Sequence, residues 1–299
     1  MSDEKKAKTE MRNAKSENLH QFSTLQIIEL MNEEDATVAG IVKTALPEIE
    51  KVIDEVVSVM RNGGRLFYFG AGTSGRLGVL DASECPPTFG VAADLVNGVI
   101  AGGDRALRYP IEGAEDRREL GAEDVRKHVS ERDMVIGLAS SGRTPYVLGA
   151  MEAANEMGAK TAGISCNTNA PLSKIVTYAI ELPVGPEVVT GSTRLKAGTA
   201  QKMVLNMITT TSMVKLGKVY RNLMVNVQAS NEKLRKRTVS IIRELTGVSE
   251  GEAARYSAQA EGDARVAVLM VLLKVDAEGA KQMLEEKGGD FVAVMEELN

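Results

Sequence analysis

Apolar residues recur along this chain in two alternating patterns. Short apolar runs, which are typical of buried strands, alternate with longer segments in which apolar residues return every three or four positions, as on amphipathic helices. The runs that we interpret as strands are residues 65–69, 94–100, 133–139, 161–165 and 178–182. This alternation predicts an α/β fold, with a doubly wound, five-stranded parallel sheet that helices cover on both faces.

Helical spacing dominates the segment before the first strand. A capping-box pattern at residues 23–26 predicts the start of one helix, and the polar residues 32–35 should end it. A longer helix is expected over residues 38–61, with Pro47 kinking or interrupting it. We therefore interpret residues 1–62 as an N-terminal helical arm that packs on the core.

The pattern changes again near residue 238. A second capping box at residues 249–252 and the stop signal Gly288-Gly289-Asp290 divide this region into about three short helices. The apolar residues expected to form their shared core are Val266, Val268, Leu269, Val271, Leu272, Leu273 and Met283. Residues 238–299 are therefore interpreted as a small C-terminal helical domain, and residues 63–237 as the core domain.

Glycine and hydroxyl residues gather in the turns that follow three of the expected strands. The turns cover residues 70–75, 140–144 and 190–199, and the third opens a long helix that runs to about residue 216. The carboxyl ends of neighbouring parallel strands meet at one edge of a sheet, where helix N-termini attract anions. We therefore expect the first two turns to converge on one phosphate.

The candidate substrate-binding residues come from all three turns. They are Gly72, Thr73, Ser74, Ser140, Ser141, Arg143, Thr144, Ser192 and Lys196. Serine and threonine in such turns also serve as ordinary helix caps, and caps and phosphate ligands use the same geometry. The basic side chains alone would suit an ordinary surface, but their position within glycine–hydroxyl turns favours contact with an anion.

A dinucleotide site is an alternative interpretation of the first turn. Gly70, Gly72 and Gly75 have the G-x-G-x-x-G spacing of such sites. A dinucleotide site also needs an acidic residue at the far end of the second strand, whereas Asp94 lies at its start and the far end reads Ala101-Gly102-Gly103. The hydroxyl-rich turn after the third strand has no role in that scheme. The residues therefore favour a single sugar phosphate.

The composition limits which cellular compartment and which classes of binding partner we expect. The 299 residues include 36 basic and 41 acidic side chains, a net charge of −5, so bulk charge attracts neither nucleic acid nor an acidic membrane. Cys85 and Cys166 form neither a disulfide pattern nor a metal pattern, and we find neither a signal peptide nor a membrane-spanning apolar stretch. We expect a cytoplasmic protein without a metal or cofactor.

Several longer motifs carry a resemblance to a known family. They are residues 70–78, 81–90, 112–116, 140–146 and 189–202. These motifs resemble those of the N-acetylmuramic acid 6-phosphate etherases, which are built on a sugar-isomerase (SIS) domain, and the likeness extends from about Thr9 to the C-terminal helices. His20 and Thr168 depart from the family's pattern, outside these motifs. The resemblance implies a flavodoxin-like SIS core and a UBA-like C-terminal domain.

The resemblance also implies a reaction. The family removes the D-lactyl ether at C3 of the sugar, a carbon–oxygen lyase reaction of cell-wall amino-sugar recycling that gives N-acetylglucosamine 6-phosphate and D-lactate. By resemblance, Glu115 is the base at C2, Glu84 is the acid that protonates the departing lactate, and Glu112 binds substrate. From the residues alone, Glu84 also fits a helix-end carboxylate, and Glu115 a solvated acidic run.

Glu84 lies well beyond the first turn along the chain. If residues 74–83 form a straight helix, Glu84 stands roughly 15 Å from Thr73, at about 1.5 Å per residue. This distance exceeds the reach of one sugar phosphate from its phosphate-binding turn. We therefore expect a homodimer with shared active sites, in which Glu84 serves the site of the second subunit.

Two other functions are compatible with the same turns. A phosphosugar isomerase also begins by removing the C2 proton, but it needs no acid for a leaving group. A sugar-phosphate sensor that resembles the glucokinase regulatory protein binds through similar turns without chemistry. That protein carries two SIS domains, whereas this chain has length for one.

Overall fold

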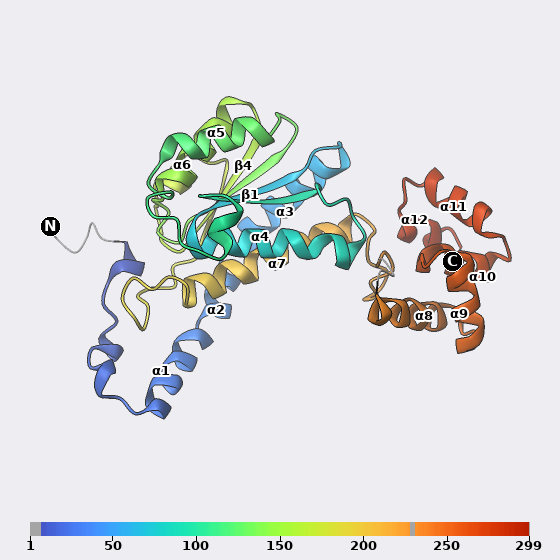
Figure 1. Cartoon of the computed structure of the whole chain (residues 1–299), viewed down its shortest axis with the longest axis horizontal. Helices are drawn as coiled ribbons and strands as arrows, with labels where there is room; N and C mark the ends of the chain where they lie inside the picture. The colour runs from blue at the N-terminus through green and yellow to red at the C-terminus, as the bar shows by residue number, and fades with distance from the viewer. Residues whose placement is uncertain (1–6, 228–230, 299) are drawn as a thin grey trace. The chain divides into compact units, whose positions relative to one another are not determined.

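The structure, a computed structural model, describes residues 7–227 and 231–298 (Figure 1). The chain separates into two compact units. The first takes Met1–Ser83 and Asp94–Thr209, and the second takes Glu84–Ala93 and Thr210–Asn299. This division follows packing and passes through two helices, so the predicted domain boundaries after residues 62 and 237 stay predictions.

The first unit contains a five-stranded parallel sheet in the order β2-β1-β3-β4-β5. The strands are β1 (Leu66–Gly70), β2 (Val96–Ile100), β3 (Met134–Leu138), β4 (Lys160–Ser165) and β5 (Tyr178–Glu181). The predicted α/β fold and its strands are confirmed. This strand order is flavodoxin-like, and its switch point lies between β1 and β3, where ligands bind at the carboxyl ends of the strands.

Helices and short 3-10 turns precede, connect and follow the strands. The helices are α1 (Thr24–Ala36), α2 (Val38–Thr44), α3 (Leu46–Arg61), α4 (Gly72–Phe89), α5 (Arg118–His128), α6 (Pro145–Glu156) and α7 (Lys196–Lys215). The 3-10 turns are η2 (Lys8–Glu10), η3 (Ala14–Ser16), η4 (Leu19–Gln21), η5 (Asp104–Leu107) and η6 (Leu172–Lys174).

Strand register shows which helices share a face of the sheet. Tyr68 and Tyr178 lie on the same face, because they align with each other across β3 and β4. The Tyr68 hydroxyl donates to Asp81 on α4 at 3.2 Å, and the Tyr178 hydroxyl donates to Glu55 on α3 at 2.7 Å. Helices α3 and α4 therefore cover this face.

Helices α5 and α6 pack side by side on the other face (Figure 1). Their buried core includes Phe67, Phe69, Val125, Val135, Val147 and Met151. Glycine allows the two helices to approach closely: a Cβ atom on Gly121 would lie 1.9 Å from the carbonyl oxygen of Tyr146, and one on Gly149 would lie 2.0 Å from that of Arg118.

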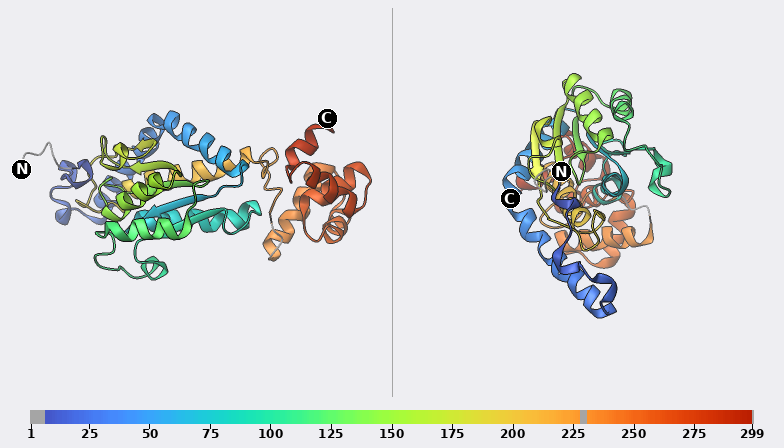
Figure 2. Two further views of the ribbon diagram at one scale, coloured as in Figure 1. Left: turned by 90° about the horizontal axis from the view of Figure 1, so that it is seen from above. Right: turned by 90° about the vertical axis from the view of Figure 1, so that its left-hand side faces the viewer.

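Helix α1 of the N-terminal arm begins as predicted but ends later than predicted. Ser23 and Gln26 form the expected capping box, and the backbone N–H of Ser23 donates to Gln26 at 2.8 Å. Helix α1 continues through the polar residues 32–35 to Ala36, because one of them, Glu34, is buried in an ion pair. A break precedes α3, and Pro47 lies in the first turn of α3, as expected. Helix α1 extends away from the sheet (Figure 2).

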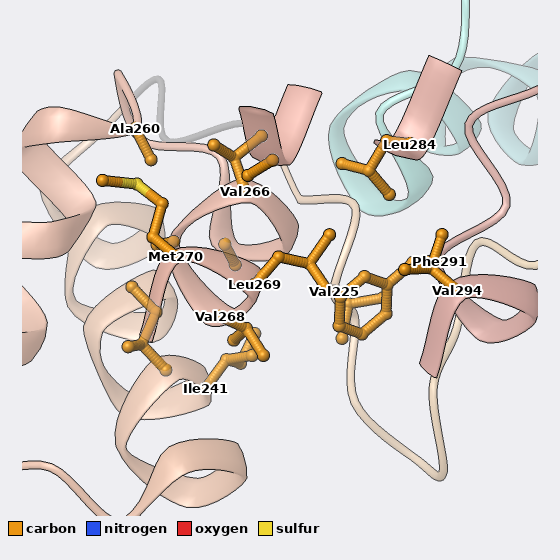
Figure 3. Packing of buried hydrophobic residues seen from close by; sticks show 14 of the residues in the cluster. Val225, Ile241, Ala260, Val266, Val268, Leu269, Met270, Leu284, Phe291 and Val294 are labelled. Carbon is orange, nitrogen blue, oxygen red and sulfur yellow. The ribbon is translucent and has the colours of Figure 1, made fainter. Parts of the chain in front are cut away.

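The second unit has its own hydrophobic core (Figure 3). Its helices are α8 (Glu232–Thr246), α9 (Glu250–Gln259), α10 (Ala264–Leu273), α11 (Ala277–Glu286) and α12 (Phe291–Glu296). The expected count of about three helices is therefore too low for residues 231–298. The capping box at Ser249 is confirmed, as is the helix start after Asp290, whereas Leu272 is exposed and lies outside the core.

The close approach of α5 and α6 gives a test of the fold. Gly121→Ala should lower the free energy of unfolding by about 1–3 kcal/mol, because its methyl group would overlap the Tyr146 carbonyl. Gly40→Ala is the matched control, since a Cβ there meets nothing within 4 Å and alanine favours the helix by at most about 1 kcal/mol. Urea denaturation measures both. An equal effect of the two substitutions would contradict this packing.

Candidate active site

The first two hydroxyl-rich turns meet at the carboxyl ends of β1 and β3, as the sequence predicts. The hydroxyl oxygens of Ser74 and Ser140 lie 3.4 Å apart. Between the turns is a cleft of about 430 Å³, lined by Gly72, Thr73, Ser74, Ser140, Ser141, Arg143 and Thr144. The structure therefore brings seven of the predicted binding residues to one concave site.

Glycines shape both turns for steric reasons. Gly72 has a φ angle of 53° and Gly142 one of 68°, conformations that residues with a Cβ rarely adopt. A Cβ on Gly142 would also lie 2.3 Å from the Cβ of Ala170. The turns can therefore fold tightly over the strand ends and leave the helix N-termini open to the cleft.

Thr144 precedes α6 without capping it. Its side chain makes no capping hydrogen bond, although its position is the N-cap of the helix. The N–H of Tyr146 donates instead to the carbonyl oxygen of Glu115, at 3.0 Å. The Thr144 hydroxyl therefore remains available to a ligand, which separates it from an ordinary capping residue.

Ser74 forms part of a buried polar group beneath the cleft. Its hydroxyl donates to the side-chain carbonyl of Gln201 at 2.8 Å. Gln201 lies on α7 and is fully buried, and its Nε2 has no hydrogen-bond partner among the described residues. Sequence reasoning missed Gln201, whose signal is a polar side chain within the apolar part of α7. The contact fixes the Ser74 hydroxyl at the cleft floor.

Glu115 lines the same cleft, and in the sequence it lies between the first two turns. Its side chain is exposed, and the hydrogen bond from Tyr146 ties its backbone to the start of α6. Asp116 also lines the cleft and was not predicted. Glu112, the third acidic candidate of this segment, lines a second cavity of about 220 Å³ that shares Glu115 as a wall residue.

Glu84 belongs to the second unit and lines neither cavity. It is exposed near the carboxyl end of α4, and Pro86 and Pro87 lie within the same helix. Its assignment to a neighbouring subunit's site stays a prediction.

Comparison with known proteins assigns the family. A curated N-acetylmuramic acid 6-phosphate etherase from Halalkalibacterium halodurans is 51% identical over 295 residues, which are 98% of this chain and 99% of the relative. A protein of the same name from Bacillus cereus is 54% identical over 282 residues, 94% of this chain and 96% of the relative. The chain belongs to the N-acetylmuramic acid 6-phosphate etherase family.

Broader comparisons agree with the fold of this etherase family member. The family model for the glucokinase regulatory protein N-terminal SIS domain matches residues 48–155, and that for the SIS domain matches residues 112–211. A phosphoheptose isomerase from Francisella tularensis has a TM-score of 0.53 at 17% identity and covers 64% of this chain and 100% of its own. A putative phosphosugar isomerase from Bacteroides fragilis has a TM-score of 0.53 at 16% identity and covers 69% and 98%. These structures share the SIS fold.

The third turn of this etherase family member is arranged differently from the first two. Gly191 and Thr193 line the cleft, whereas Ser192 and Lys196 line neither cavity. Lys196 is buried, and its Nζ pairs with the carboxylate of Glu34 on α1 at 2.5 Å. The structure thus places Lys196 in contact with the N-terminal arm.

Glu187 precedes α7 in the chain, and its side chain reaches the start of that helix. Its carboxylate is fully buried and accepts hydrogen bonds from the backbone N–H groups of Lys196 and Ala197, both at 3.0 Å. Burial raises the pKa of Glu187, and the two hydrogen bonds oppose that rise. The chain's own carboxylate therefore takes the place that an anion would have at this helix end. Sequence reasoning missed this residue.

The N-terminal arm of the etherase chain reaches the cleft. Glu10 lines it, and the neighbouring Thr9 is buried. The Asn167 side chain accepts from the Thr9 N–H at 3.3 Å and donates to the Thr9 hydroxyl at 3.1 Å and to the Ser140 carbonyl at 3.0 Å. Asn167 therefore joins the arm to the second turn, and this contribution was not predicted.

The described residues contain no group of three or more His, Cys, Asp or Glu side chains that could hold a metal ion. Within residues 7–227 and 231–298, no helix combines the length and apolar character needed to cross a membrane.

The buried pair of Glu34 and Lys196 predicts a loss of stability on substitution. Glu34→Gln should lower the free energy of unfolding at pH 7 by about 3 kcal/mol, because Lys196 would stay buried without its partner. Glu33→Gln, at an exposed neighbour, is the control. Urea denaturation of both variants measures the difference.

The effect of Glu34→Gln should also depend on pH. Burial raises the pKa of Glu34, but hydrogen bonds and charges from Lys196 and Lys15 outweigh it and hold the pKa below its usual 4.5. The stabilisation is therefore present above pH 4.5 and lost as the pH falls through the lowered pKa. A gap between the unaltered and Glu34→Gln chains that persisted at still lower pH would contradict the ion pair.

Proposed function

We propose that this protein cleaves the D-lactyl ether of N-acetylmuramic acid 6-phosphate and forms N-acetylglucosamine 6-phosphate and D-lactate. Support comes from identities of 51% and 54%, over nearly the full length, to proteins named for this substrate. The observation that carries the proposal is that Glu115 shares one cleft with two hydroxyl-rich turns. A candidate anion site and a candidate base thereby line the same cleft.

The hydroxyl groups of the two turns bind the phosphate in this proposal. Ser140, Ser141 and Thr144 surround it from the second turn, Thr73 approaches from the first, and Arg143 adds a positive charge at the exposed rim. The N-terminus of α4 contributes its unpaired N–H groups, and the positive end of the α6 dipole adds to the attraction. Ser192 and Lys196 shape the third turn, with Lys196 held by Glu34.

The reaction begins with the open form of the sugar, whose C1 aldehyde makes the C2 proton acidic. Glu115 removes that proton, the C3–O bond breaks as the C2–C3 double bond forms, and an acid protonates the departing lactate oxygen. Water then adds at C3 to restore the hydroxyl group. Elimination of the lactate is a carbon–oxygen lyase step, and we assign its acid to Glu84.

We further propose that Glu84 acts in the cleft of a second subunit. Its place about eleven residues after Thr73 on α4 puts it roughly 16 Å along the helix, beyond the reach of one bound sugar phosphate. Helix α1 presents Leu25 and Ile28 with 59% and 54% of their surface exposed, as expected for a helix that packs on another chain. The substrate, a phosphorylated sugar, and two buried cysteines outside any disulfide suit the cytoplasm.

Glu115→Gln tests the assignment of the base. The variant should lose D-lactate release by about 10²- to 10⁴-fold and lose exchange of the C2 proton of N-acetylglucosamine 6-phosphate with deuterated water to a similar extent. Glu123→Gln, at an exposed carboxylate on α5, should change neither rate. If the Glu115→Gln protein exchanged the C2 proton normally, another residue would be the base.

The reaction type has its own test. The unaltered protein, incubated with N-acetylmuramic acid 6-phosphate in oxygen-18 water, should release D-lactate and carry the label at C3 of the product sugar. Absence of D-lactate would contradict the proposed function, and interconversion of an aldose and a ketose would then indicate an isomerase. Label on lactate rather than at C3 would contradict elimination followed by hydration.

Mixed subunits test the shared site. Glu84→Ala and Glu115→Ala proteins, each inactive alone, should regain about a quarter of the unaltered activity after subunit exchange, because half the dimers then hold one intact site. Differently tagged subunits verify the exchange by co-purification. Confirmed exchange without recovered activity would contradict a site built from two chains.

A further inference from the structure

A second cavity of about 220 Å³ adjoins the cleft. The two spaces share Ala71, Gly72 and Glu115 in their walls. Apolar side chains form much of the lining of the second cavity, namely Ala101, Ala106, Ile111 and Ala114. We call this space the side cavity. Nothing in the proposed chemistry at C2 or in the binding of phosphate uses it.

Arg76 is the one cation among the described residues that line the side cavity. It is half-buried on α4, and its Nε and Nη2 atoms donate to the carbonyl oxygens of Leu107 and Ala106 at 3.0 and 2.7 Å. These two bonds hold the guanidinium group against η5. Its Nη1 atom donates to no acceptor within the described part of the chain, so the group is fixed in place with hydrogen-bond donors still available.

The charges around the side cavity are unequal. Glu112 and Glu115 contribute two carboxylates to its lining, against the single positive charge of Arg76. A further anion can enter only where it contacts the guanidinium directly, because elsewhere both carboxylates repel it. The cavity therefore suits a small group that has one carboxylate and an otherwise apolar surface.

We propose that the side cavity binds the D-lactyl group of the substrate. Arg76 pairs with the lactyl carboxylate, and the apolar wall receives the lactyl methyl group. This placement agrees with the order of atoms in the substrate. Glu115, in the wall that both spaces share, acts at C2. The ether is attached to the neighbouring carbon, C3, so the lactyl group can extend from there into the side cavity. This inference rests on the proposed function and names the residue that would distinguish a lactyl ether from a simple sugar phosphate.

Arg76→Gln separates binding of the lactyl group from support of the loop. The variant should lower kcat/KM for release of D-lactate by about 10- to 100-fold, as expected when a charge-assisted hydrogen bond is lost. Deuterium exchange at C2 of N-acetylglucosamine 6-phosphate should stay near the rate of the unaltered protein, because that sugar has no lactyl group. Arg105→Gln, which removes an equally charged, exposed residue of η5 outside both cavities, should change neither measurement. Equal losses in the two assays would overturn the proposal, because they would mean that Arg76 only holds η5.

A second measurement uses the unaltered protein and does not depend on folding of the variant. The 3-O-ethyl ether of N-acetylglucosamine 6-phosphate differs from the substrate only by lacking the carboxylate, and it should bind about 10- to 100-fold more weakly in competition with the substrate. Equal affinity would overturn the subsite while leaving the proposed function intact. Failure of the unaltered protein to release any D-lactate would instead overturn the proposed function, and the subsite with it.

Discussion

The backbone of α4 lies closer to β1 and β2 than any side chain between them would permit. A Cβ atom on Gly98 would stand 2.5 Å from the Cα of Val79, and one on Gly75 would stand 2.7 Å from the carbonyl oxygen of Gly70. The first contact requires glycine on the strand, and the second joins two glycines. This close approach brings the first turn of α4 directly over the strand ends, and the position of the cleft depends on that.

This contact also explains why the G-x-G-x-x-G spacing is a poor guide to the ligand. Gly70 and Gly75 meet each other across the turn, and Gly72 supplies a positive φ angle. All three serve the strand–turn–helix junction itself, whichever phosphate binds there. The informative residues of the first turn are Thr73 and Ser74, because their side chains line the cleft and a dinucleotide site has no need of them.

Much of the fold and the meeting of the first two turns could be predicted because both rest on local pattern. Strands buried on two faces are continuous apolar runs, and the turns after β1 and β3 must meet once the sheet is parallel. The extra C-terminal helices escaped prediction because they are short and separated by brief polar segments. Contacts between residues far apart in the chain escaped as well: the partners Glu34 and Lys196 are 162 positions apart, and Ser74 and Gln201 are 127 positions apart. No local pattern marks the partner of a buried polar group.

The hydrogen bonds between Thr9 and Asn167 have a consequence for synthesis of the chain. The ribosome makes Thr9 before Asn167, whose side chain binds both the arm and the Ser140 carbonyl and follows 158 residues later. The strands β1 to β4 precede that point, so a nascent sheet can begin to collapse while the arm is still unattached. Glu10 therefore joins the wall of the cleft only late in synthesis, which leaves a growing chain with an unfinished site until most of the first unit has emerged.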